Sequence, residues 1–154
     1  MNRVVRFLGR TPVQSFLLLP LVILIWELWW QGQNLKVESL FLLLMPWGFL
    51  QYRLCGRYRI KRGGGGPGLE KPPERLVVTG PYAYTRNPMY LGHIICLLGI
   101  TLALNSVLGA VITAARALWF HYRVRYDERR LAEQFGEPYI DYQKTVKRWI
   151  PGLL

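Results

Sequence analysis

Four apolar segments, separated by short polar turns and basic stretches, dominate the hydrophobic pattern of the chain. They run from about Val13 to Trp30, Val37 to Tyr52, Met89 to Leu104 and Val107 to Tyr122. The first is close to the roughly 20 residues that a helix needs to cross a bilayer of about 30 Å, and the last two are shorter. Pro46 is expected to kink the second segment. The pattern predicts an all-α integral membrane protein.

The last two segments meet at Asn105-Ser106, which predicts a tight helical hairpin. The fourth helix is expected to continue into the cytoplasm as far as Gln134. Gly136 then ends it, and Glu137-Pro138 opens another helix. One face of this last helix is expected to carry Tyr139, Tyr142, Val146 and Trp149, an arrangement that suits a helix lying at the membrane surface. We therefore expect a four-helix transmembrane bundle with a cytoplasmic C-terminal helical extension.

Basic residues set the expected orientation of this bundle. Seven Lys and Arg lie between Arg53 and Arg75, and seven more between Arg123 and Arg148, whereas Asn105-Ser106 carries no charge. The positive-inside rule then gives four spans with both termini in the cytoplasm. The net charge of +11 is read as attraction to anionic lipid, not to nucleic acid.

We expect one membrane domain over residues 1–154, with a two-span half at 1–55, a glycine-rich linker at 56–75 and a C-terminal half at 76–154. The first span lacks a small-residue cleavage site and is expected to be retained. The glycine run at Gly63–Gly68 has no following Lys-Ser/Thr, which favours a flexible linker over a phosphate-binding loop. The two cysteines and two histidines have no partners at ligand spacing, so neither a disulfide nor a metal site is predicted.

The most informative stretch, RLVVTGPYAYTRNPMYLG, leads into the third apolar segment. Gly80-Pro81 predicts a turn. Asn87-Pro88 predicts a helix cap followed by proline at the first helical position. The start of a helix beside Arg86 can bind a carboxylate or a phosphate. The alternative is that Asn87 only caps the helix and the tyrosines of the loop only anchor it at the membrane interface.

A second charged stretch, RVRYDERRLAEQFGEPYIDYQKTVKRWIP, follows the fourth segment and contains the acidic pair Asp127-Glu128. Taken alone, this pair could simply form solvated ion pairs with Arg123, Arg129 and Arg130, which contribute little to stability.

In their order and spacing, these two stretches around an apolar hairpin resemble the isoprenylcysteine carboxyl methyltransferase family, especially its short bacterial members, and the related phospholipid N-methyltransferases. The resemblance covers about Leu76 to Pro151. The family's Arg-His-Pro-x-Tyr appears here as Arg86-Asn87-Pro88-Met89-Tyr90, and its Glu-Glu pair appears as Asp127-Glu128. The first change removes a titratable group, while the second keeps both negative charges.

This resemblance implies a methyltransferase that uses S-adenosylmethionine and acts on a lipid-like or small amphiphilic substrate. One wall of the implied cofactor site consists of Gly80, Pro81, Tyr82, Arg86, Asn87, Pro88, Tyr90 and Gly92. Asp127 and Glu128 belong to the other wall. Acidic groups and tyrosine faces suit the cations of the cofactor, and Arg86 with helix amides suits its carboxylate.

The acceptor group is left open by the sequence. A carboxylate acceptor needs an arginine to orient it, for which Arg116 and Arg148 are candidates, whereas an amine acceptor needs a base such as Glu128. Arg116 lies within an apolar segment and could instead pair with Glu27. Two other functions remain possible, a nicotinamide-dependent membrane reductase similar to sterol reductases and a non-catalytic membrane module.

Overall fold

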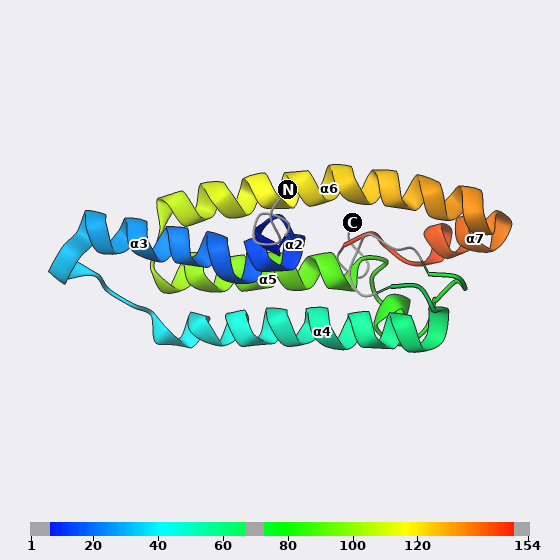
Figure 1. Cartoon of the computed structure of the whole chain (residues 1–154), viewed down its shortest axis with the longest axis horizontal. Coiled ribbons are helices and arrows are strands. Elements are labelled where there is room, and N and C mark those ends of the chain that lie inside the picture. The colour runs from blue at the N-terminus through cyan, green and yellow to red at the C-terminus, as the bar shows by residue number, and fades with distance from the viewer. Residues whose placement is uncertain (1–6, 67–72, 150–154) are drawn as a thin grey trace. The chain divides into compact units, whose positions relative to one another are not determined.

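The computed structural model describes residues 7–66 and 73–149, and every regular element in these ranges is a helix. The α-helices are α2 (Thr11–Val13), α3 (Leu19–Gln31), α4 (Leu44–Gly63), α5 (Pro88–Ala103), α6 (Val107–Phe135) and α7 (Glu137–Thr145), shown in Figure 1. The predicted all-α class is therefore confirmed for the described part of the chain.

The chain is organised into two compact units. Unit 1 comprises Met1–Leu50 and Gly92–Leu118, and unit 2 comprises Gln51–Leu91 and Trp119–Leu154. Helices α4, α5 and α6 each contribute residues to both units. The predicted single membrane domain with boundaries at residues 55 and 75 stays a prediction.

The first apolar segment forms a helix of 21 residues from Thr11 to Gln31. Its turn at Gln14–Leu18 is π-helical and ends two residues before Pro20, whose ring would otherwise crowd the preceding turn. Among the described helices, this is the one both long and apolar enough to cross a bilayer, and α5 is a shorter apolar helix. The first and third predicted segments are thus helical, while the four-span arrangement stays a prediction.

The second apolar segment differs from its prediction at both ends. A 3₁₀ helix at Ser39–Leu43 precedes α4, so Pro46 lies in the first turn of α4 and not in the middle of a helix. The N–H groups of a first turn have no partner within the helix, so a proline there removes no helical hydrogen bond and requires no kink. At the other end α4 continues past Tyr52 to Gly63, so the first part of the predicted linker is helical. Only Gly64–Gly66 of the glycine run follow the helix within the described residues.

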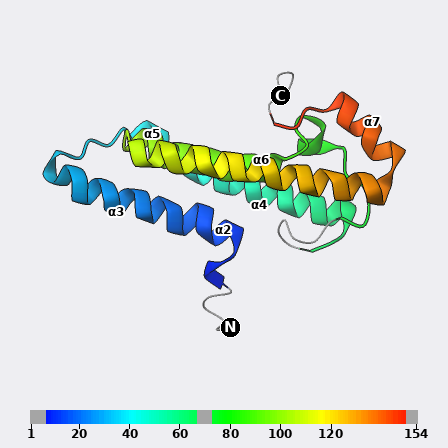
Figure 2. The same ribbon diagram turned by 90° about the horizontal axis from the view of Figure 1, so that it is seen from above.

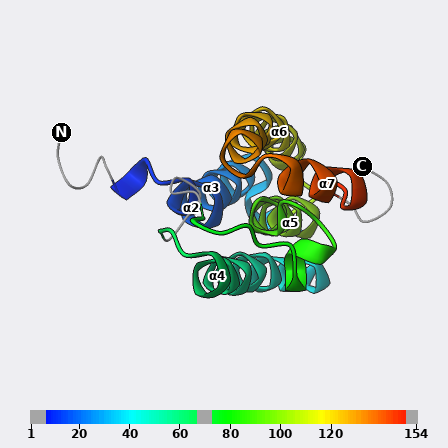
Figure 3. The ribbon, with the colours of Figure 1, turned by 90° about the vertical axis from the view of Figure 1, so that its right-hand side faces the viewer.

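The core of unit 1 contains Ile23, Ile100 and Leu104, packed with side chains from α4 and α6. Figure 3 shows α3 next to α5 and α6. The predicted hairpin is confirmed, with Asn105 at a φ of 47° between α5 and α6. The Ser106 hydroxyl accepts the Gly109 N–H at 2.8 Å and donates to the Glu27 carboxylate at 2.5 Å. The turn is therefore capped locally and tied to α3.

Small residues allow α4 and α5 to approach closely within unit 1. A Cβ atom on Gly48 would lie 2.7 Å from the backbone nitrogen of Cys96 and would overlap the carbonyl oxygen of Gly92. A Cβ on Gly99 would lie 3.0 Å from the Met45 backbone nitrogen. Such contacts are typical of helices that pack backbone against backbone in membranes.

Arg116 does not form the ion pair with Glu27 that was one of its predicted roles. Its guanidinium donates to the Gln14 amide oxygen at 3.0 Å and to the Ser15 hydroxyl at 3.4 Å. Glu27 accepts from Gln31 and Ser106 instead. Gln14 and Glu27 are 27 − 14 = 13 residues apart on one helix, a rise of about 20 Å, which is too far for one arginine to bond both.

Candidate functional site

Unit 2 folds its C-terminal part back on α6. Gly136, with a φ of 61°, ends α6, and α7 turns back from that end, as Figure 2 shows. Helix α7 ends at Thr145 because Val146 is extended. The prediction that Val146 and Trp149 continue the tyrosine face of this helix is therefore wrong. We call the segment Val146–Trp149, which follows α7, the C-terminal strap.

The loop before α5 is shaped by glycine and proline. Gly80 has a φ of 61°, and a Cβ atom there would lie 2.7 Å from Cζ of Tyr58. A 3₁₀ turn at Gly80–Ala83 follows, with Pro81 near its start. It buries Tyr82, whose carbonyl oxygen accepts a hydrogen bond from the Tyr142 hydroxyl at 2.6 Å. The predicted Gly-Pro turn is confirmed, and it links the loop to α7.

The residues just before α5 bind the C-terminal strap. The Arg86 N–H donates to the carbonyl of Lys147 at 3.0 Å. The Thr85 hydroxyl and the Asn87 side-chain amide both donate to the carbonyl of Arg148, at 3.0 Å and 3.3 Å. The carbonyl of Asn87 accepts the N–H of Leu91, as expected for the residue that starts α5. The asparagine that replaces the family's histidine therefore holds the strap as well as beginning the helix.

Glu128 is the centre of a buried charge network. Its carboxylate lies 2.9 Å from the Arg86 guanidinium and 2.7 Å from that of Arg148. The side chains of Glu128, Arg86 and Arg148 are 6%, 9% and 28% exposed, respectively. Arg86 also donates to the carbonyls of Gln143 and Val146, at 2.9 Å and 2.6 Å. Four of the five donors of Arg86 are thus used within the protein.

Asp127, the other member of the acidic pair, has different partners. It accepts the Tyr90 hydroxyl at 2.6 Å and lies 3.7 Å from Nε of Arg123. The Tyr90 ring packs edge-on against Phe120, with centroids 4.8 Å apart. The start of α5 and the second half of α6 are therefore joined by a polar and an aromatic contact. The alternative prediction was that both acids form only solvated ion pairs. It is wrong for Glu128, which is buried, and holds only in part for Asp127, which pairs with Arg123.

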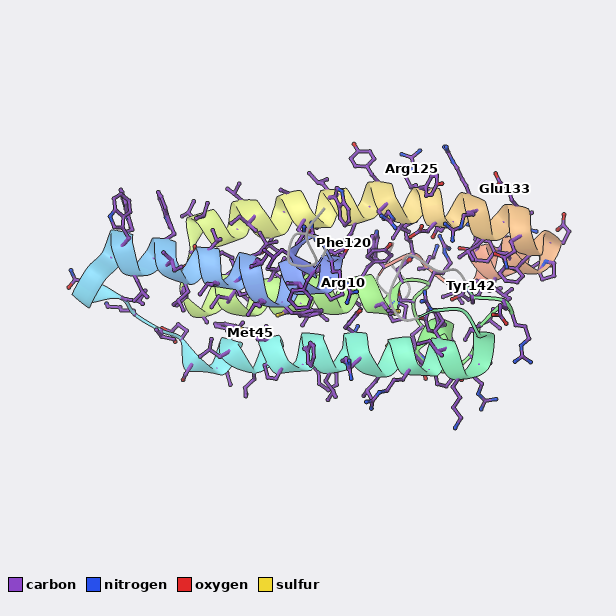
Figure 4. The ribbon with its side chains drawn as sticks, in the orientation of Figure 1. Arg10, Met45, Phe120, Arg125, Glu133 and Tyr142 are labelled. Carbon is purple, nitrogen blue, oxygen red and sulfur yellow. The ribbon has the colours of Figure 1, made fainter. Side chains whose placement is uncertain are left out.

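Three further tyrosines make the interior of unit 2 aromatic. Tyr82, Tyr139 and Tyr142 are buried, and burial raises the pKa of each phenol above its usual value, so all three stay neutral at physiological pH. Figure 4 shows Arg125 and Glu133 extending away from α6, while Tyr142 lies among the side chains inside unit 2. The tyrosine face of α7 is therefore directed to the protein interior, not to a membrane surface as predicted.

These elements line a cavity whose water-accessible volume is about 90 Å³. Its floor and walls combine apolar, aromatic and charged groups. The lining residues are Arg59, Pro73, Leu76, Val77, Tyr82, Arg86, Asn87, Pro88, Met89, Tyr90, Asp127, Glu128, Arg130, Leu131, Tyr139 and Tyr142.

Most of the residues predicted from the sequence to bind a cofactor line this cavity: Tyr82, Arg86, Asn87, Pro88, Tyr90, Asp127 and Glu128. Gly80 and Pro81 shape the loop behind it. Gly92 and Arg116 lie in unit 1 with the contacts described above. Arg148 reaches the site through its ion pair with Glu128. The individual roles assigned to these residues stay predictions.

The sequence prediction missed Arg59, Arg130, Tyr139 and Tyr142 as lining residues. Arg59 was placed in a linker, whereas it lies on the extension of α4. Tyr139 and Tyr142 are three residues apart near the start of α7, a spacing that already indicated one helical face but not which way it is directed.

Comparisons with known proteins match about half of the chain. The family model described as phospholipid methyltransferase matches residues 67–138. The protein-S-isoprenylcysteine O-methyltransferase of Schizosaccharomyces pombe is 36% identical over 78 residues, which cover 49% of this chain and 33% of that protein. The enzyme of the same name from Saccharomyces cerevisiae is 40% identical over 78 residues, covering 49% and 32%. The one from Mus musculus is 35% identical over 77 residues, covering 49% and 27%.

These matches relate about half of the chain to proteins that are named as methyltransferases. The resemblance to the isoprenylcysteine carboxyl methyltransferase family, which the motifs predicted, is confirmed by relatives of that name that align with 49% of the chain and by the family model over residues 67–138. The matched segment spans only about a third of the length of these curated relatives.

Proposed function

We propose that this protein is a membrane-embedded methyltransferase that uses S-adenosylmethionine and methylates a lipid-like or small amphiphilic substrate. The observation that carries the proposal is that the Tyr82–Tyr90 loop and the Asp127-Glu128 pair line one cavity in unit 2. The names of the relatives support methyl transfer as the reaction class.

The residues around the cavity fit this cofactor. Its sulfonium and ammonium groups suit the faces of buried tyrosines and the carboxylate of Asp127, and its adenine suits an apolar wall that includes Val77, Met89 and Leu131. When bound, S-adenosylmethionine supplies an electrophilic methyl group and leaves as a neutral thioether. The protein's contribution is to align the acceptor with that group and to exclude water.

Arg86, Glu128 and Arg148 are proposed to position the site and not to act on the substrate. Arg86 is bonded to Glu128 and to the carbonyls of Gln143 in α7 and Val146 in the strap. These bonds support a role in holding α7 and the strap in place. The bonds of Arg116 to Gln14 and Ser15 support a structural role within unit 1.

A carboxylate is proposed as the acceptor group, in preference to an amine. Glu128 was the candidate base for an amine, but its carboxylate oxygens are bonded to the guanidinium groups of Arg86 and Arg148 and are therefore occupied by protein partners. A carboxylate is already ionised at neutral pH and needs no base. The O-methyltransferase names of the relatives support the same choice.

The membrane arrangement is also part of the proposal. We propose four spans, with both termini in the cytoplasm of a bacterial inner membrane. The apolar helix Thr11–Gln31 and the shorter apolar helix α5 support it, as do the clusters of basic residues at the ends of the predicted spans.

The proposal is tested by incubating the purified full chain with methyl-labelled S-adenosylmethionine and a total lipid extract. A carboxyl methyl ester releases its label as volatile methanol in mild alkali, whereas a methylated amine does not. We expect alkali-labile lipid products with wild-type protein and with the Asp141→Asn control, whose carboxylate is exposed on α7, and strongly reduced labelling with Asp127→Asn. Alkali-stable products would refute the carboxylate acceptor, and binding of NADPH without S-adenosylhomocysteine would favour the reductase alternative.

A further inference from the structure

Three arginines line the cavity of unit 2, and they differ in how far the protein uses them. Arg86 is bonded to Glu128 and to two carbonyl groups. Arg59 donates from Nη2 to the carbonyl of Gly66 at 3.2 Å. Arg130 is half-buried, yet within residues 7–66 and 73–149 its guanidinium has no hydrogen bond or ion pair. Among the described residues, no group of the protein is a partner for the Arg130 donors.

The two acids that precede Arg130 on α6 are already occupied by other groups, and Glu133, three residues after it, is exposed and extends away from the helix (Figure 4). Asp127 is bonded to Tyr90 and paired with Arg123, and Glu128 is paired with Arg86 and Arg148. The network around Glu128 contains two guanidinium groups for one carboxylate. Three arginines and two carboxylates line the cavity, so its lining carries a net positive charge.

The helical position of Arg130 agrees with this assignment. It lies three residues after Asp127 and directly before Leu131, both of which also line the cavity, and residues three apart share a helix face. Gln134, four residues further on, donates to the carbonyl of the lining residue Pro73 at 3.0 Å. The neighbouring Arg129 is exposed and does not line the cavity.

We infer that Arg130 is the anion-binding residue of the cavity and takes the carboxylate of a bound small molecule. The planar guanidinium can bind both carboxylate oxygens at once, which gives orientation as well as affinity. This inference rests on the proposed function, under which a carboxylate can come from the amino-acid end of the cofactor or from the acceptor substrate. Both sources have the same chemistry and are separated by experiment.

The test compares Arg130→Gln with Arg129→Gln, a matched control on the adjacent exposed position. Circular dichroism and thermal unfolding of each purified full-length variant first establish that it is folded, and Arg130→Lys provides a second variant that keeps the charge but loses the planar fork. Equilibrium binding is then measured for four probes: S-adenosylhomocysteine, its decarboxylated analogue, an N-acetyl S-prenylcysteine and the methyl ester of that compound.

If the cofactor supplies the carboxylate, Arg130→Gln should weaken S-adenosylhomocysteine binding at least tenfold and leave the decarboxylated analogue unchanged. If the substrate supplies it, the same variant should weaken binding of the prenylcysteine acid at least tenfold and leave its ester unchanged. Arg130→Lys should lie between wild type and Arg130→Gln, and Arg129→Gln should match wild type. Equal affinities of the Arg130 variants and wild type for all four probes would refute the assignment. Wild-type protein that binds none of the probes would instead refute the proposed function.

Discussion

Replacing Glu128 by glutamine is the most informative perturbation of the charge network, because it keeps the shape of the side chain and removes only its charge. Glu128 is 6% exposed and is paired with Arg86 and Arg148 at 2.9 Å and 2.7 Å. Removing one partner of a buried ion pair costs about 3–5 kcal/mol, because the remaining charge is left uncompensated. Most of this cost should come from Arg86, since Arg148 is 28% exposed and can regain water.

The loss can be measured as the free energy of unfolding in detergent micelles, with Glu133→Gln as the control. Glu133 lies on the same helix, and its side chain extends away from it (Figure 4), so its substitution should leave stability unchanged within error. Hydrogen exchange gives a local readout, because Glu128→Gln should also release the C-terminal strap and speed exchange of the Arg86 amide, whose N–H donates to the Lys147 carbonyl. Equal stability and equal exchange in the two variants would refute the view that Glu128 holds α7 and the strap.

A hydrogen bond, a buried thiol and a close helix–helix approach each give a further prediction. Tyr90→Phe removes the donor to Asp127 at 2.6 Å, and calorimetry should show about tenfold weaker S-adenosylhomocysteine binding; unchanged affinity would exclude a role for this bond. Burial raises the pKa of the Cys55 thiol to about 11, so about one thiol in a thousand is ionised at pH 8, and iodoacetamide should modify Cys55 far more slowly in the folded protein than after denaturation. Equal rates, measured by mass spectrometry, would contradict its burial. Gly48→Ala forces a methyl group against the α5 backbone and should lower the unfolding temperature through a loss of about 1–3 kcal/mol; a variant as stable as wild type would disprove the close approach.

The helices could be predicted from the sequence because local signals define their ends. Asn87-Pro88, Asn105-Ser106 and Gly136 coincide with the observed ends of α5 and α6 and the start of α7. The sequence prediction ends helix α4 too early, at Tyr52, because the basic residues that follow suggest a boundary. Arginine and lysine are good helix formers and tolerate an exposed face, so the helix continues through Arg53 and Arg57 until glycine ends it.

The sequence predicted most of the residues that line the cavity, but not which of them bond to one another. Tyr90 and Asp127 are joined although they lie 127 − 90 = 37 residues apart, and Arg86 and Glu128 are joined across 128 − 86 = 42. No local pattern shows which acid pairs with which base. The sequence therefore predicts Arg86 as a partner of a cofactor carboxylate, and the structure adds its bonds to Glu128. The sequence predicts Arg130 only as a partner in a solvated ion pair.

The most direct test of the account is to locate the bound cofactor by ultraviolet crosslinking of labelled S-adenosylmethionine to the full chain, followed by peptide mapping. We expect label in peptides from the Tyr82–Tyr90 loop and from the stretch between Asp127 and Tyr142. Excess S-adenosylhomocysteine should abolish this label, and NADPH should leave it unchanged. Label confined to other segments, or label that the competitor does not displace, would contradict the assignment of the unit 2 cavity as the cofactor site.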